Sequence, residues 1–224
     1  MALAATPFLA KAAVLWFGFA GYGLQSIYKL VQLAVPCWWR YSRQSARGVR
    51  VLWPTDERLP SGRTLGLAVL VAAALSGSAI AAATWILPRL QIEPEKIRAG
   101  LDARFPIGSI GAILIVVFLS LVNSALEELH FRAWLDRELS LRWGSPAGWS
   151  ISASAFGAMH VLIFMGMRDL PILALVLVPA ALIIAGAAWS WLLRRPGGIH
   201  AAWLSHAITD VLLLGWGLHW LGYT

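Results

Sequence analysis

Three groups of ionisable residues lie within or beside long apolar stretches of this 224-residue chain. Their members are Glu127 and Glu128 with Arg132, then His160, and then His206 with Asp210. A carboxylate and a histidine together can hold a water molecule and remove its proton. A second histidine can donate a hydrogen bond to an oxyanion that develops on a carbonyl group. These groups are the ones that amide hydrolysis needs when no serine or cysteine acts as nucleophile.

Helical spacing indicates which of these side chains share a face. Glu128 and Arg132 are four residues apart, the spacing of an ion pair on one helix. Glu127 is displaced from Glu128 by about 100° around a helix, so it can point elsewhere. One carboxylate can therefore be structural while the other faces a cavity. His206 and Asp210 are also four residues apart, so Asp210 can orient the imidazole of His206.

Each ionisable residue taken alone has a simpler interpretation. A carboxylate at the end of an apolar stretch is commonly an interfacial charge, and a single histidine in a membrane helix commonly bonds to another helix. We interpret His200 and His219 in this way, because they lie near the ends of their stretches, and we expect His130 at the surface. Three ionisable groups on three separate stretches nevertheless favour a functional site, because charges at membrane depth are costly.

The composition is that of an integral membrane protein. Apolar residues make up 59% of the chain and charged residues 13%, whereas a soluble domain carries about 25% charged residues. Apolar stretches of spanning length predict an all-α, polytopic helical bundle with about six transmembrane helices. Five stretches are clear, at 64–87, 106–126, 146–166, 171–193 and 199–222.

A sixth stretch, within residues 7–39, is interrupted by lysines and glutamines. It is either a span with snorkelling lysines or an interfacial helix. It lacks a good signal-peptidase site and a basic loop follows it, so we expect it to be retained. Residues 131–141 alternate apolar and charged side chains, which predicts a helix along the cytoplasmic surface.

The net charge of +7 is distributed over the loops, which argues against a nucleic-acid partner. Lysine and arginine accumulate in cytoplasmic loops, and the arginine-rich loop at 40–63 is therefore expected inside. Alternation of the remaining loops then leaves most basic residues inside and puts Glu127 and Glu128 near the cytoplasmic face. The arginine-heavy composition favours a prokaryote, so we expect its cytoplasmic (inner) membrane. Cys37 is the only cysteine, which excludes an intrachain disulfide.

The ionisable groups also resemble, in order, the three motifs of a known family. Glu127-Glu128-x-x-x-Arg132, Phe156-x-x-x-His160 and His206-x-x-x-Asp210 are similar to the motifs of the CPBP family, also called Abi. These CAAX-prenyl proteases and bacteriocin-processing enzymes are glutamic intramembrane endopeptidases that resemble the Ras-converting CAAX endoprotease. The resemblance covers about residues 106–215. It implies a catalytic helical core at 106–224, preceded by membrane helices and loops at 1–105, within one membrane domain.

The resemblance implies a role for each matched residue. Glu127 would be the general base that activates the attacking water, and His160 would help to hold that water and shuttle protons. Glu128 and Arg132 would form a supporting ion pair, and Phe156 would pack beside the site. The implied partners are the lipid bilayer and a membrane-anchored protein or peptide substrate, and no cofactor or metal ion is implied.

His206 and Asp210 occupy the positions of the oxyanion-stabilising pair, but Asp210 departs from the asparagine of the best-studied CAAX proteases. An ionised aspartate cannot donate a hydrogen bond. Asp210 must therefore be protonated, or it must orient and charge His206. The chain also has fewer spans than the archaeal CAAX protease type, so a prenylated substrate does not follow from the resemblance.

Two alternatives remain open. Glu127-x-x-His130, with His160, His206 and Asp210, offers ligands to zinc or iron, although no His-Glu-x-x-His motif is present. A non-catalytic immunity, scaffold or transporter-like protein would keep the fold without peptidase activity. Activity that survives strong chelators would remove the first alternative, and a cleavage assay addresses the second.

Overall fold

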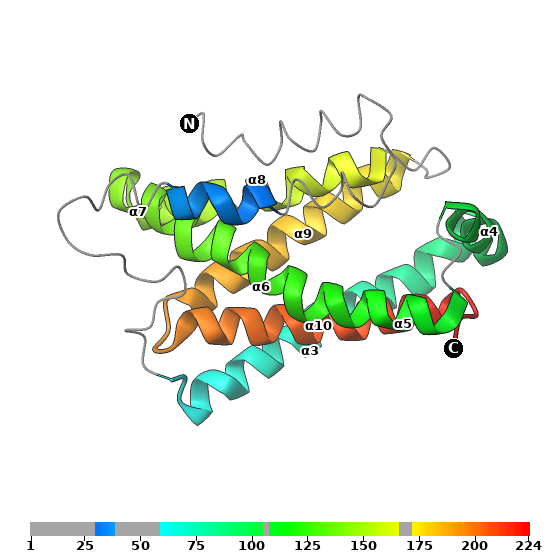
Figure 1. Ribbon diagram of the computed structural model, residues 1–224, viewed down its shortest axis with the longest axis horizontal. Helices are drawn as coiled ribbons and strands as arrows, with labels where there is room; N and C mark the ends of the chain where they lie inside the picture. The colour runs from blue at the N-terminus through cyan, green and yellow to red at the C-terminus, as the bar shows by residue number, and fades with distance from the viewer. Residues whose placement is uncertain (1–29, 39–58, 105–107, 166–171) are drawn as a thin grey trace.

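The computed structural model describes residues 30–38, 59–104, 108–165 and 172–224, which are almost entirely helical (Figure 1). No β-strand occurs among these residues. Residues 30–38 form a short helix. The later α-helices are α3 (Gly62–Arg89), α4 (Pro94–Arg104), α5 (Gly108–Phe118), α6 (Ser124–Glu127), α7 (Arg137–Trp143), α8 (Ser145–Met165), α9 (Ile172–Leu193) and α10 (Gly198–Trp220). The predicted all-α membrane fold is confirmed.

Four helices of the described chain are long and apolar enough to cross a membrane, namely Gly62–Arg89, Gly108–Trp143, Val176–Leu193 and Gly198–Trp220. They correspond to four of the five clear stretches in the sequence. The fifth stretch, 146–166, forms α8. The sixth stretch lies outside the described residues except for the helix at 30–38.

The helix from Gly108 to Trp143 is continuous over 36 residues, because two π-helical segments join α5, α6 and α7. These segments are η2 (Leu119–Asn123) and η3 (Glu128–Asp136). A π-helical turn contains an extra residue and commonly marks a functional site. Here the two segments enclose the short helix α6, whose last residue is Glu127.

The expected surface helix at 131–141 is wrong for its first half. Phe131, Arg132, Trp134 and Asp136 are buried, and His130, also expected at the surface, is fully buried. Charges enter the interior here because each has a partner. Arg132 pairs with Glu128, and Asp136 accepts two hydrogen bonds from Arg194, at 2.9 and 3.2 Å. The alternating pattern thus marks a helix buried among other helices.

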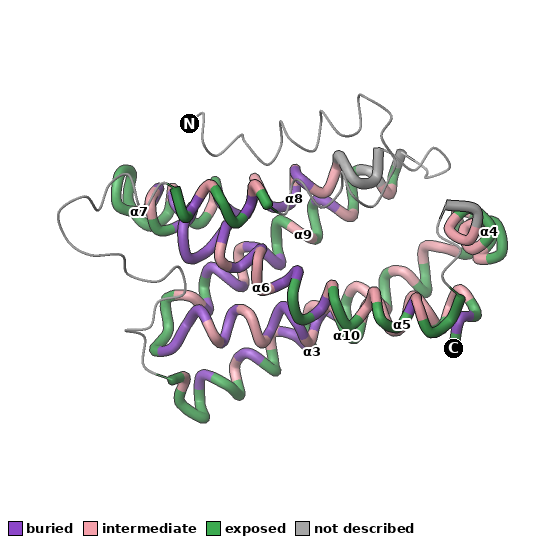
Figure 2. Tube along the Cα trace, viewed as in Figure 1, coloured by how far each residue is buried: buried purple, intermediate pink, exposed green. Residues whose placement is uncertain are grey.

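Buried residues gather around α6, η3 and the parts of α8, α9 and α10 that face them, whereas the start of α5 is exposed (Figure 2). Helix α8 packs along α9, and α10 packs along α3. Gly157 of α8 permits the first of these contacts. A Cβ atom built there would lie 2.4 Å from Ile183 Cγ1 and 2.7 Å from the carbonyl oxygen of Pro179. Small residues at such crossings let membrane helices approach closely.

Gly157→Ala should lower the free energy of unfolding by about 1–3 kcal/mol, because the added methyl group overlaps the α9 backbone. Gly77→Ala is the matched control, since nothing lies within 4 Å of a Cβ built at that glycine of α3. It should be neutral or stabilising, because alanine favours helix more than glycine does. Thermal unfolding in one detergent compares the two variants. Equal unfolding temperatures would contradict the close α8–α9 contact.

Helix α4 is tied to the C-terminal end of α10 by a small polar cluster. The hydroxyl of Tyr223 donates to Asp102 Oδ1 at 2.6 Å, and Arg98 Nη1 donates to the carbonyl oxygen of Gly222 at 2.5 Å. The Arg98 guanidinium also lies 4.6 Å from the centroid of the Tyr223 ring. Gly222 has a φ of 72°, which glycine adopts without strain.

This cluster predicts a loss of stability at alkaline pH. The hydrogen bond to Asp102, followed by burial, raises the pKa of Tyr223 above its ordinary value of 10.0. The neutral phenol therefore stabilises the fold fully below pH 10.0, and this contribution is lost as the pH rises through the folded-state pKa. Thermal unfolding of the wild type and of Tyr223→Phe should converge as the pH increases past that value. A difference that does not change with pH would contradict the assignment.

Candidate active site

Glu127 and Glu128 lie at the junction of α6 and η3, where α8, α9 and α10 all contact the long helix. Both side chains are buried, with 3% and 0% of their surface exposed. Adjacent residues on a helix diverge by about 100°, yet both carboxylates reach the same partner on α10. That partner is His206, which is itself 2% exposed.

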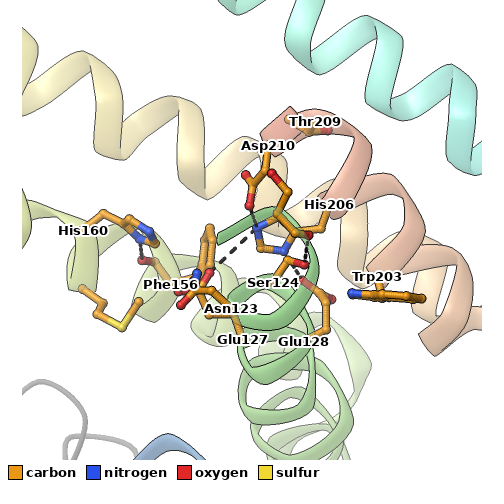
Figure 3. Close-up of polar contacts among 12 residues, drawn as sticks. Asn123, Ser124, Glu127, Glu128, Phe156, His160, Trp203, His206, Thr209 and Asp210 are labelled. Carbon is orange, nitrogen blue, oxygen red and sulfur yellow. Dashed lines mark hydrogen bonds and ion pairs between the residues drawn. The ribbon is translucent and has the colours of Figure 1, made fainter. Parts of the chain in front are cut away.

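His206 lies between three carboxyl groups (Figure 3). Its Nδ1 is 2.8 Å from Glu128 Oε1, a hydrogen bond. Its Nε2 is 3.8 Å from Glu127 Oε2 and 3.6 Å from Asp210 Oδ2. An ionised carboxylate only accepts hydrogen bonds, so Nδ1 donates to Glu128 and Nε2 faces the other two carboxyl groups. The hydrogen bond to Glu128 therefore orients the ring. From the sequence, Arg132 was the only predicted partner of Glu128.

Glu128 therefore has two partners. The predicted ion pair with Arg132 is present, with Nη1 and Oε1 3.3 Å apart and both side chains fully buried. The same Oε1 accepts the hydrogen bond from His206. One carboxylate consequently links the arginine of the long helix to the histidine of α10.

Aromatic rings surround the buried guanidinium of Arg132. Its Cζ lies 4.6 Å from the Phe156 centroid, 5.2 Å from that of Trp189 and 5.9 Å from that of Phe131. None of its three side-chain nitrogens has a hydrogen-bond partner within the described part of the chain. Cation–π attraction and the ion pair with Glu128 therefore hold this charge in place.

Trp189 of α9 holds the imidazole ring of His206 from one side. The two rings are stacked, with centroids 3.8 Å apart and planes 14° apart, and Trp189 Nε1 donates to Ser205 Oγ at 3.3 Å. The sequence did not single out Trp189. The chain has 13 tryptophans, and tryptophans of membrane proteins are generally assigned to interfacial belts.

His160 of α8 lies on the opposite side of the Phe156 ring from His206 (Figure 3). The centroid of Phe156 is 4.7 Å from that of His160 and 5.8 Å from that of His206. Nδ1 of His160 is 2.9 Å from the carbonyl oxygen of Phe156, and its side chain is half-buried. The structure thus brings residues of all three motifs together, and the Phe156 ring lies between His160 and His206.

Asn123, like Trp189, belongs to the site but was not among the residues predicted from the sequence. Its Nδ2 donates to Glu127 Oε1 at 3.0 Å, and its side chain is buried. The four-residue spacing between Asn123 and Glu127 was the available signal, because it puts both on one helical face.

The segment that contains all three motifs also matches a known family. Residues 109–212 match the family model described as type II CAAX prenyl endopeptidase Rce1-like. This segment is Rce1-like. The match runs from α5 to α10 and includes every site residue from Asn123 to Asp210, so the predicted family is confirmed. No curated protein and no solved structure matches the chain.

The Rce1-like match and the apolar helices support a membrane endopeptidase in general. In the Rce1-like site three carboxyl groups lie around the imidazole of His206, and one of them, Glu128, also pairs with Arg132. Among the described residues, no group of three or more His, Cys, Asp and Glu side chains is arranged to hold a metal ion. A buried carboxyl group and an imidazole at this distance can accept and donate protons.

Proposed function

We propose that the chain is an intramembrane glutamic endopeptidase that hydrolyses a peptide bond in a membrane-associated protein or peptide tail. The observation that chiefly supports this proposal is the buried pair of Glu127 Oε2 and His206 Nε2, 3.8 Å apart. That separation is too long for a direct hydrogen bond, and a water beside the two atoms could bond to both of them.

In the proposed reaction, Glu127 removes a proton from a water molecule as the water oxygen forms a bond to the scissile carbonyl carbon. The carbonyl oxygen becomes an oxyanion, and a proton on His206 Nε2 donates a hydrogen bond to it. The carbon–nitrogen bond then breaks, and Glu127 passes its proton to the leaving amine. The new carboxylic acid gives its proton to the amine, so the products are a carboxylate and a protonated amine, and Glu127 is ionised again.

The other site residues would support these steps. Glu128 fixes the imidazole at Nδ1, so that Nε2 faces the reacting oxygen. Asp210, 3.6 Å from Nε2, favours the positively charged imidazole that stabilises an oxyanion. His160 would hold the water from the side of Phe156. We place the site towards the cytoplasmic face of a prokaryotic inner membrane, because that orientation puts most basic loop residues inside.

A cleavage assay with the purified protein in lipid nanodiscs tests the proposal. Candidate substrates are lipid-modified tails and leader peptides, with the products identified by mass spectrometry. We expect a single new carboxyl terminus, turnover that persists in the presence of strong chelators, and loss of turnover in His160→Ala. Turnover that stops with chelator and returns with added zinc or iron would favour the metal-dependent alternative. No cleavage of any class of peptide would favour the non-catalytic scaffold.

A further inference from the structure

We propose that Asn123 is a positioning residue that sets the direction of the Glu127 carboxylate, a role that rests on the proposed function. Asn123 is the last residue of η2, one helical turn before Glu127. Its side chain is 8% exposed, and the bond from Nδ2 to Glu127 Oε1 is 3.0 Å long. Nothing in the three motifs assigns a role to this position.

The chemistry of the two side chains fixes the orientation of the Asn123 amide. A carboxamide has one end that donates and one that accepts, whereas an ionised carboxylate only accepts. The Nδ2 end must therefore face Glu127, because the opposite orientation would put two acceptors in contact. The Oδ1 end has no hydrogen-bond partner within the described residues. Asn123 is thus held in this buried position through its donor end, which is directed at Glu127.

This hydrogen bond distinguishes the two oxygens of Glu127. Oε1 accepts from Asn123, while Oε2 faces His206 Nε2 across 3.8 Å. The last torsion angle of a glutamate side chain otherwise takes a broad range of values. With Oε1 held, the other oxygen is directed at the space beside His206, where the proposed water would react. A general base must reach its proton in a narrow geometry, so this restriction favours catalysis.

The helical turn that carries Asn123 is itself anchored by side chains that satisfy its carbonyl groups. Trp203 of α10 donates from Nε1 to the carbonyl oxygen of Leu121 at 3.1 Å. The hydroxyl of Ser124 donates to the carbonyl oxygen of Ser120. The Trp203 bond holds the π-helical turn against α10, which also carries His206. The spacing between Asn123, Glu127 and His206 is therefore set by packed helices.

The test compares Asn123→Leu with the wild type in the peptide cleavage assay. Leucine has nearly the shape of asparagine but cannot donate. We expect kcat to fall by about 10- to 100-fold, the effect of losing a hydrogen bond to a charged group, with KM changed less than about twofold. The unfolding temperature should also fall, because Glu127 Oε1 loses its buried donor. A purely structural role would lower stability and leave kcat of the folded protein unchanged.

Three further variants keep the result interpretable. Asn123→Gln restores a donor and should retain more of kcat than Asn123→Asp, which accepts only and adds a negative charge. Ser120→Ala is the matched control on the same turn, because Ser120 is fully buried and its hydroxyl has no partner among the described residues. It should keep the wild-type kcat. If Asn123→Leu is unstable, the order of the Gln and Asp variants decides, and equal kcat values for these two would overturn the proposal.

Glu127→Gln is measured in parallel to separate this inference from the proposed function. Turnover that survives Glu127→Gln would reject Glu127 as the base, and with it the proposed function. An inactive Glu127→Gln together with a wild-type kcat for a folded Asn123→Leu would reject only the role of Asn123. An inactive Glu127→Gln, a reduced kcat for Asn123→Leu and an unchanged Ser120→Ala would support both.

Discussion

Glu127→Gln should reduce peptide cleavage by about 10²- to 10⁴-fold, the usual contribution of a general base. Glutamine has the shape of glutamate and can still accept the hydrogen bond from Asn123, but it cannot take a proton from water. The side chain is 3% exposed, so replacing a buried charge with a neutral amide should not lower stability. Cleavage rates and unfolding temperatures are measured together, so that a loss of folding is not taken for a loss of catalysis.

Glu138→Gln provides the matched control for this experiment. It makes the same change of charge on the same continuous helix, in α7, and its side chain is half-buried. Cleavage by Glu138→Gln should equal that of the wild type. A Glu127→Gln variant that cleaves as fast as Glu138→Gln would show that Glu127 is not the base.

Arg132→Met should lower the free energy of unfolding by about 3–5 kcal/mol, because it removes the arginine that pairs with a fully buried carboxylate. Arg132 and Glu128 are both fully buried and 3.3 Å apart. Methionine fills much of the volume of the arginine stem, so the lost stability comes mainly from removing the charge. Chemical unfolding in detergent measures the effect, and Arg137→Met, at an exposed position five residues on, is the control.

The double variant Glu128→Gln/Arg132→Met identifies the cause of the loss. Removing both charges leaves no uncompensated ion, so the double variant should regain much of the stability that Arg132→Met loses. An equal loss in the single and double variants would instead assign the effect to packing of the arginine against Phe156 and Trp189. A wild-type stability for Arg132→Met would contradict the ion pair as a stabilising contact.

The sequence predicted the features that depend on local spacing. Apolar stretches of spanning length indicated the helices, and a four-residue spacing indicated the ion pair of Glu128 with Arg132. Both rest on the helical period, which a sequence displays directly. The three motifs also predicted the family, because residue types in that order are specific even though each motif alone is short.

Features that depend on contacts between distant helices could not be predicted in this way. The hydrogen bond from His206 to Glu128 joins residues 78 positions apart, and no local pattern indicates it. The buried half of 131–141 was misinterpreted for the same reason, since the partner of Asp136 is Arg194 of the segment after α9. Trp189 could not be distinguished from the other tryptophans until its ring was found on the imidazole.

The shared carboxylate of Glu128 also constrains how this protein can change over evolutionary time. Because one oxygen serves both Arg132 and His206, substitutions at the arginine alter the histidine, and the two positions cannot drift independently. Their effects should be strongly non-additive, as expected for residues that share a partner. A lineage that loses the arginine must replace Glu128 at nearly the same time, and it then loses the group that orients its histidine. Selection for folding and selection for turnover therefore act on the same atom.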